Sequence, residues 1–132
     1  MVFFIRGNRG QSVIEFAMVL PLLLLVVFGI TEFSRAWMTV NILTQASREG
    51  ARLAVVTAPD VALVTARVNE VCNAAGVTTT GITVVPPSSS DPERRVTVTV
   101  QADFQVIPGT ILGTFSGTIP LSATSVMRHE SM

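Results

Sequence analysis

A long apolar stretch near the N-terminus constrains this chain more than any other feature. No charged residue occurs between Phe16 and Thr31, and apolar residues continue before Glu15. Sixteen helical residues span about 24 Å, so the helix must include residues from Ser12 onward to cross a hydrocarbon core of about 30 Å. The stretch therefore predicts one membrane-spanning helix with Glu15 inside or at the edge of the bilayer.

The charges that precede this stretch predict its orientation. Arg6 and Arg9 lie on its N-terminal side, and arginine beside a membrane helix favours the cytoplasm. We therefore expect a single-pass protein of the cytoplasmic (inner) membrane, in contact with its lipid. Its N-terminus would be cytoplasmic, and the residues after the helix would be extracytoplasmic.

Three kinds of processing are open for this segment: retention as an uncut anchor, removal as a secretory signal cut after Ala36, or loss of a short basic leader that ends at Gly10. Two features favour the third. Glu15 interrupts the start of the apolar region, which an ordinary signal peptide would avoid. The helical pattern also continues without a break through residues 34–36.

Glu15 itself requires a physical explanation. A carboxylate at the centre of a membrane helix costs roughly 2.5–3.5 kcal/mol, so such residues are usually functional or paired. One interpretation places Glu15 at the interface, where water partly solvates it. The other makes it the fifth residue of a mature chain that begins at Gln11. Its charge would then pair with the α-amino group of a neighbouring subunit.

The composition argues against most other classes of function. The 132 residues carry a formal net charge of zero, which disfavours a nucleic-acid interface. Cys72 and His129 are the single residues of their types, so no disulfide framework or metal cluster is expected. The serines at 88–90 lack a residue to activate them. We expect no enzymatic activity, no cofactor and no small-molecule substrate.

The helical pattern continues beyond the membrane. From Ile30 to Ala54, apolar and small residues that include Trp37 recur at three- and four-residue steps, which is typical of one face of a helix. Pro59 disfavours continuation, so this helix should end near Thr57. A second helix is expected to follow, with Thr57 or Ala58 as its N-cap and Gly76 as its stop. Its expected buried face comprises Val61, Val64, Val68, Val71, Cys72 and Ala75.

After the second helix the pattern changes to that of strands. Residues 81–85 form a short strand, and residues 96–106 and 119–128 alternate between apolar and polar. The sequence thus predicts an α+β fold with a long N-terminal helix, a second helix and a small antiparallel sheet of about three strands. Because the sheet region alone has a marginal core, its apolar face should dock on the outer half of the long helix.

The leader region resembles a type IV prepilin processing site. In such a site a Gly precedes the cut, and an apolar helix follows with Glu at its fifth position; Gly10, Gln11 and Glu15 fit this arrangement. With residues 46–52 and 123–130, it makes the chain similar to the TadE-like minor pilins of tight-adherence (Tad, or Flp) pili. The resemblance implies cleavage by a prepilin peptidase between Gly10 and Gln11, and a role for Glu15 in helix register during assembly.

The same resemblance implies partners and a domain organisation. The partners would be the prepilin peptidase, the major Flp-type pilin, other minor pilins and the assembly machinery, within the membrane or in an extracellular pilus. Arg48, Glu49 and Arg52 become candidates for contact with another subunit. The expected domains are a prepilin leader (1–10), a transmembrane helix segment (11–31), its extracytoplasmic continuation (32–57) and a small globular head (58–132).

Two other functions stay open on the residues alone. One is a membrane-anchored extracytoplasmic interaction domain outside any filament. The other is a small secreted domain released by cleavage after Ala36. A Glu15→Ala substitution separates the pilin from the plain anchor, because only a pilin should lose assembly.

Overall fold

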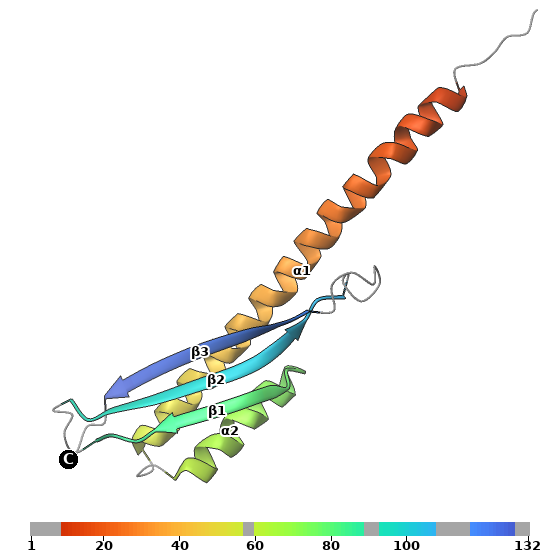
Figure 1. Ribbon diagram of the computed structural model, residues 1–132. Coiled ribbons are helices and arrows are strands. Elements are labelled where there is room, and N and C mark those ends of the chain that lie inside the picture. Colours follow the sequence, from red (N-terminus) through yellow and green to blue (C-terminus); the bar gives the residue numbers. More distant parts are fainter. Residues whose placement is uncertain (1–8, 57–59, 89–92, 108–116, 129–132) are drawn as a thin grey trace, which may run out of the picture. The chain divides into compact units, whose positions relative to one another are not determined.

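The computed structural model of the protein describes residues 9–56, 60–88, 93–107 and 117–128, which form two helices and three strands (Figure 1). The elements are α1 (Arg9–Val56), α2 (Val61–Ala74), β1 (Thr79–Val85), β2 (Arg95–Gln105) and β3 (Thr118–Arg128). This content confirms the α+β class predicted from the sequence. The chain divides into two compact units, Met1–Ser34 and Arg35–Met132.

The first unit contains the N-terminal part of α1, whose surface is apolar on all sides. Every Val, Ile, Leu, Met and Phe side chain from Val13 to Ile30 is exposed. The polar groups at the end of the stretch are satisfied within the helix. The hydroxyl of Thr31 donates to the carbonyl oxygen of Phe28 at 2.8 Å, and that of Ser34 donates to Ile30 at 3.0 Å. This surface suits lipid, which offers no hydrogen-bond partners.

In the second unit, α1 buries a face made mainly of small side chains. The face follows the predicted spacing of three and four residues, and it permits close approach of the neighbouring elements. The helix ends at Val56, as expected from Pro59. Trp37, which the same pattern placed on this face, is instead 61% exposed. The buried residues of α1 are Leu43, Ala46, Ser47, Gly50, Ala51 and Ala54.

The N-terminus of α2 corrects the predicted cap. The N-cap of α2 is Asp60 rather than Thr57 or Ala58. Thr57 and Ala58 lie outside the described ranges. The Asp60 carboxylate accepts hydrogen bonds from the backbone N–H groups of Ala62 (3.0 Å) and Leu63 (3.4 Å). A short acidic side chain is a strong acceptor for these otherwise unpaired donors.

The C-terminus of α2 confirms the predicted stop. Gly76 has a φ of +71°, a left-handed conformation that glycine adopts without strain. The N–H of Gly76 donates to the carbonyl oxygen of Asn73 at 3.0 Å, and the N–H of Val77 donates to that of Cys72 at 2.9 Å. These two bonds form a Schellman motif. Of the predicted α2 face, Val64, Val68 and Cys72 are buried, Val71 is half-buried, and Val61 and Ala75 are exposed.

The three strands form one antiparallel sheet in the order β1-β2-β3. β2 is the central strand, and its inward residues are buried while its outward residues are polar, as the alternation predicted. On the outward face, Thr99 and Thr124 of β2 and β3 share a hydrogen bond of 3.0 Å. The buried residues of β2 are Val96, Val98, Val100, Ala102 and Phe104.

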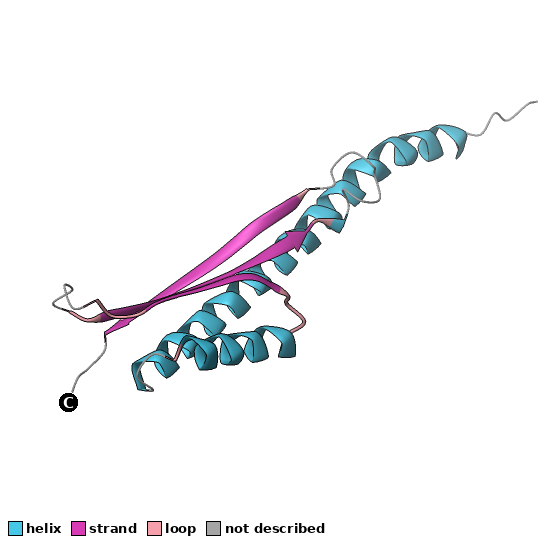
Figure 2. Cartoon of the chain, turned by 60° about the horizontal axis from the view of Figure 1, so that its bottom comes forward, coloured by secondary structure: helices cyan, strands magenta, loops and turns pink. Residues whose placement is uncertain are grey.

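Both helices cover one face of this sheet within the second unit (Figure 2). At Gly50, the backbone of α1 lies close to both α2 and β2. A Cβ atom at this position would lie 2.6 Å from Cγ2 of Val68 in α2 and 3.3 Å from Cγ1 of Val98 in β2. The core therefore depends on the absence of a side chain at Gly50. The expected docking of the sheet on the outer half of α1 is confirmed.

Candidate functional site

The predicted processing site lies at the first turn of α1. The helix begins at Arg9, and residues 1–8 of the expected leader lie outside the described ranges. The side-chain amide of Gln11 donates to Oε1 of Glu15 at 3.4 Å. This contact joins the residue that would become the mature N-terminus to the fifth residue of the mature chain, because positions four apart share one helix face. Sequence reasoning did not predict the pair, although its spacing was the signal for it.

The segment after Glu15 has the length and composition of a membrane span. Among the described residues, α1 is the one helix long and apolar enough to cross a bilayer, and the most apolar part of it is not buried by the rest of the protein. An anchor helix fits both facts, since lipid would cover the side chains that the protein leaves exposed.

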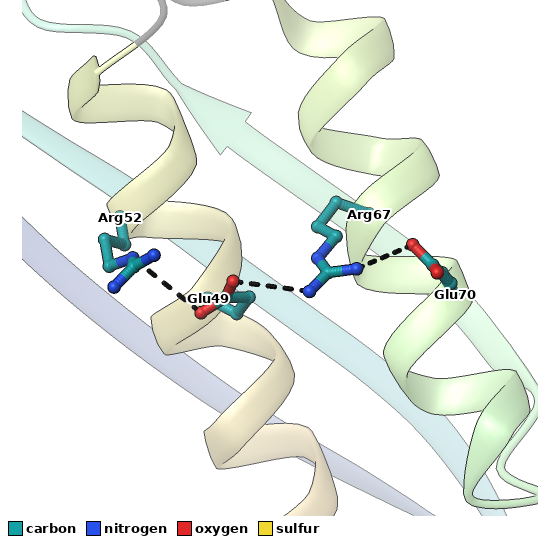
Figure 3. Close-up of polar contacts among 4 residues, drawn as sticks. All are labelled: Glu49, Arg52, Arg67 and Glu70. Atoms are coloured by element: carbon teal, nitrogen blue, oxygen red, sulfur yellow. Dashed lines mark hydrogen bonds and ion pairs between the residues drawn. The ribbon is translucent and has the colours of Figure 1, made fainter.

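The second candidate cluster lies near the C-terminal end of α1 (Figure 3). Glu49 is the acceptor at its centre: its carboxylate lies 3.5 Å from Arg67 of α2 and 4.0 Å from Arg52. Arg67 also contacts Glu70 at 2.8 Å, one turn along α2. The hydrogen bond with Glu70 and the negative charges of Glu70 and Glu49 raise the pKa of Arg67.

The three predicted contact residues of this cluster have different environments. Glu49 faces α2 and takes part in an ion pair within the chain. Arg48 is exposed, and the side chain of Arg52 is 76% exposed. Exposed ion pairs contribute little to stability, so the pairing orients these side chains more than it stabilises the fold. No local sequence pattern marks Arg67 as the partner of Glu49, because that contact joins two helices.

The remaining reactive side chain of the described residues is enclosed in the core. Cys72 is fully buried on α2, and this burial raises the pKa of its thiol. Across the described ranges, no group of three or more His, Cys, Asp or Glu side chains is placed to hold a metal ion. His129 lies outside the described residues.

The chain thus has an apolar helix that fits a membrane anchor, and a small α+β unit follows it. Residues 10–52 match the family described as TadE-like protein, which is about a third of the chain. This match confirms the predicted resemblance to TadE-like proteins. Comparisons with curated proteins and with solved structures gave no match.

Proposed function

We propose that this protein is a structural minor pilin that takes part in assembly of a tight-adherence pilus. The observation that carries the proposal is the TadE-like match, which begins at Gly10 and ends at Arg52. It begins at the residue that would precede the cut, and it includes the apolar helix and the Arg48–Arg52 segment. These are the parts that a pilin needs for processing and assembly.

In this proposal a prepilin peptidase cuts between Gly10 and Gln11 on the cytoplasmic side. The apolar part of α1 then stays in the inner membrane until it packs with the helices of other pilins. The exposed side chains from Val13 to Ile30 support this step, because they offer a complete apolar surface to lipid or to neighbouring helices. The second unit lies on the extracytoplasmic side, or in an extracellular pilus after assembly.

Glu15 sets the register of that packing. Its carboxylate is exposed on the helix surface and lies within reach of the Gln11 side chain. Cleavage of a neighbouring subunit would supply the α-amino group of its Gln11 as the partner of this carboxylate, and a charged pair in an apolar bundle is favoured only when both charges are matched. A helix shifted along its neighbour would leave a charge unpaired, so the pair selects one register.

Arg48, Glu49 and Arg52 form a contact with another subunit in the proposed assembly. Glu49 already pairs with Arg67, and the side chains of Arg48 and Arg52 supply the solvent-exposed surface of the cluster. An acidic surface on the major Flp-type pilin or on another minor pilin would complement them. The role is structural, and no residue is assigned to catalysis or to a cofactor.

The experiment compares Glu15→Gln with Glu93→Gln in the protein's own host. The control removes a carboxylate whose side chain is 60% exposed in the second unit. We expect Glu15→Gln to reduce the pilus recovered from the cell surface by at least about tenfold while the level of protein in the membrane stays unchanged, because the neutral amide inserts easily but loses the charged pair. The control should assemble normally.

Two results would contradict the proposal. Normal pili in Glu15→Gln cells would support a membrane-anchored interaction domain outside any filament. Loss of the protein from the membrane in the same cells would show that Glu15 acts in insertion rather than in assembly.

A further inference from the structure

The α-amino group is the one primary amine of this chain, because the sequence contains no lysine. The inference that follows rests on the proposed function, in which cleavage after Gly10 moves that amine to Gln11. The same group is the cation that would pair with Glu15 of a neighbouring subunit. A reaction that removes this amine therefore also removes the pairing.

Gln11 carries a second reactive group beside that amine. Its side chain ends in an amide whose carbon, Cδ, can reach the α-nitrogen of the same residue and close a five-membered ring. Gln11 is exposed, and a Cβ atom at Gly10 would meet no atom of the described residues within 4 Å. The N–H groups in the first turn of a helix have no acceptor within the helix. Neither packing against the described residues nor a helical hydrogen bond therefore opposes ring closure.

The contact with Glu15 competes with this ring. In the structure, Nε2 of Gln11 donates to Oε1 of Glu15 at 3.4 Å. Glu15 lies four residues further along the helix, a rise of about 6 Å. The contact therefore directs the amide of Gln11 away from its own α-nitrogen. An exposed pair at this spacing is weak, so it slows ring closure without preventing it.

We propose that Gln11 of the cleaved chain is a modification site at which the residue cyclises to pyroglutamate. The α-nitrogen attacks Cδ, the bond between Cδ and Nε2 breaks, and Nε2 leaves as ammonia with a proton from the amine. The reaction needs no oxidant. An α-amino group of ordinary pKa is uncharged, and so nucleophilic, in roughly a tenth of the molecules at pH 7. The product is a neutral lactam, so a cyclised subunit offers no cation to Glu15 of its neighbour.

The test uses the chain in detergent micelles, with the leader replaced by the recognition sequence of a protease that cuts directly before Gln11. The protease frees the amine at a known time, so the experiment does not depend on the prepilin peptidase. An amine-reactive dye labels the α-amino group alone, since the chain has no lysine. During incubation at neutral pH, we expect the labelling to fall. In equal proportion, the intact mass should show a species lighter by one ammonia.

Variants of the protein locate the reaction. Gln11→Ala keeps the amine but has no side-chain amide, so its labelling and its mass should stay unchanged. Glu15→Ala removes the acceptor that holds the amide, and its labelling should fall about twofold faster than that of the parent protein. The matched control is Glu93→Ala, which removes a carboxylate of the second unit and should leave the rate unchanged.

Constant labelling of the parent protein, with no loss of ammonia, overturns the proposal. The same loss of ammonia in Gln11→Ala also overturns it, because the reaction would then lie at another residue. Equal rates for Glu15→Ala and the parent protein refute the competing role of the Glu15 contact. A full-length mass in the host would instead contradict the proposed function, while the rate measured after the protease cut would stand.

Discussion

The two units of the molecule use the same apolar residue types in opposite ways. In the first unit, the Val, Leu and Phe side chains of α1 are exposed on every side of the helix. In the second unit, Val64 and Val68 of α2 and the valines of β2 are fully buried, and α1 meets them with small residues such as Ala46 and Gly50. α1 therefore has an exposed apolar surface in the first unit and a packed face in the second. The size of its side chains differs between these two parts. Large residues suit lipid or other helices, whereas small ones let the sheet approach.

The largest expected effect comes from filling the close contact at Gly50. A Cβ there would lie 2.6 Å from Val68, whereas a Cβ at Gly29 in the first unit would meet nothing within 4 Å. Gly50→Leu should lower the free energy of unfolding of the second unit by about 3 kcal/mol, because Val68 and Val98 must move. Gly29→Leu should leave that free energy unchanged within about 0.5 kcal/mol.

Labelling of Cys72 measures this difference in the full chain. Its thiol is buried, and burial raises its pKa, so the folded protein at neutral pH holds it protonated and shielded from alkylating reagents. Unfolding in urea exposes it, and the midpoint of labelling reports on the second unit. Equal midpoint shifts for Gly50→Leu and Gly29→Leu would refute the contrast between the two units.

A smaller effect is expected at the N-terminus of α2. Asp60→Ala removes the acceptor of two backbone N–H groups, and loss of an N-cap costs about 1 kcal/mol. Asp103→Ala is the control, because it removes an exposed carboxylate from β2 without affecting a helix end. The same urea titration should show a lower midpoint for Asp60→Ala alone. An unchanged midpoint for that variant would show that the cap is not needed.

Local patterns in the sequence were sufficient to predict the elements of the fold. The alternation in β2 and the stop at Gly76 depend on neighbouring residues, and both were predicted correctly. The N-cap of α2 was misplaced at Thr57 or Ala58, because the prediction took Pro59 as the start of the helix. In the structure the side chain of Asp60 decides where the first turn begins.

The contacts of the candidate sites were less predictable, because they depend on the packing of distant elements. The ion pair of Glu49 with Arg67 joins α1 to α2, and no local pattern marks it. Nor does a local pattern mark the offset by which β1 begins opposite Ala102 while β2 continues to Gln105. The processing site at Gly10 and the role of Glu15 depend on other proteins, and they stay predictions.

The central claim is that the chain loses its leader and keeps the apolar part of α1, as a pilin does. The most direct test is the intact mass of the protein extracted from the membranes of its own host. We predict a species lighter than the full 14.1 kDa chain by residues 1–10, roughly 1.2 kDa. A full-length mass, or a mass that shows loss of all residues through Ala36, would contradict the claim.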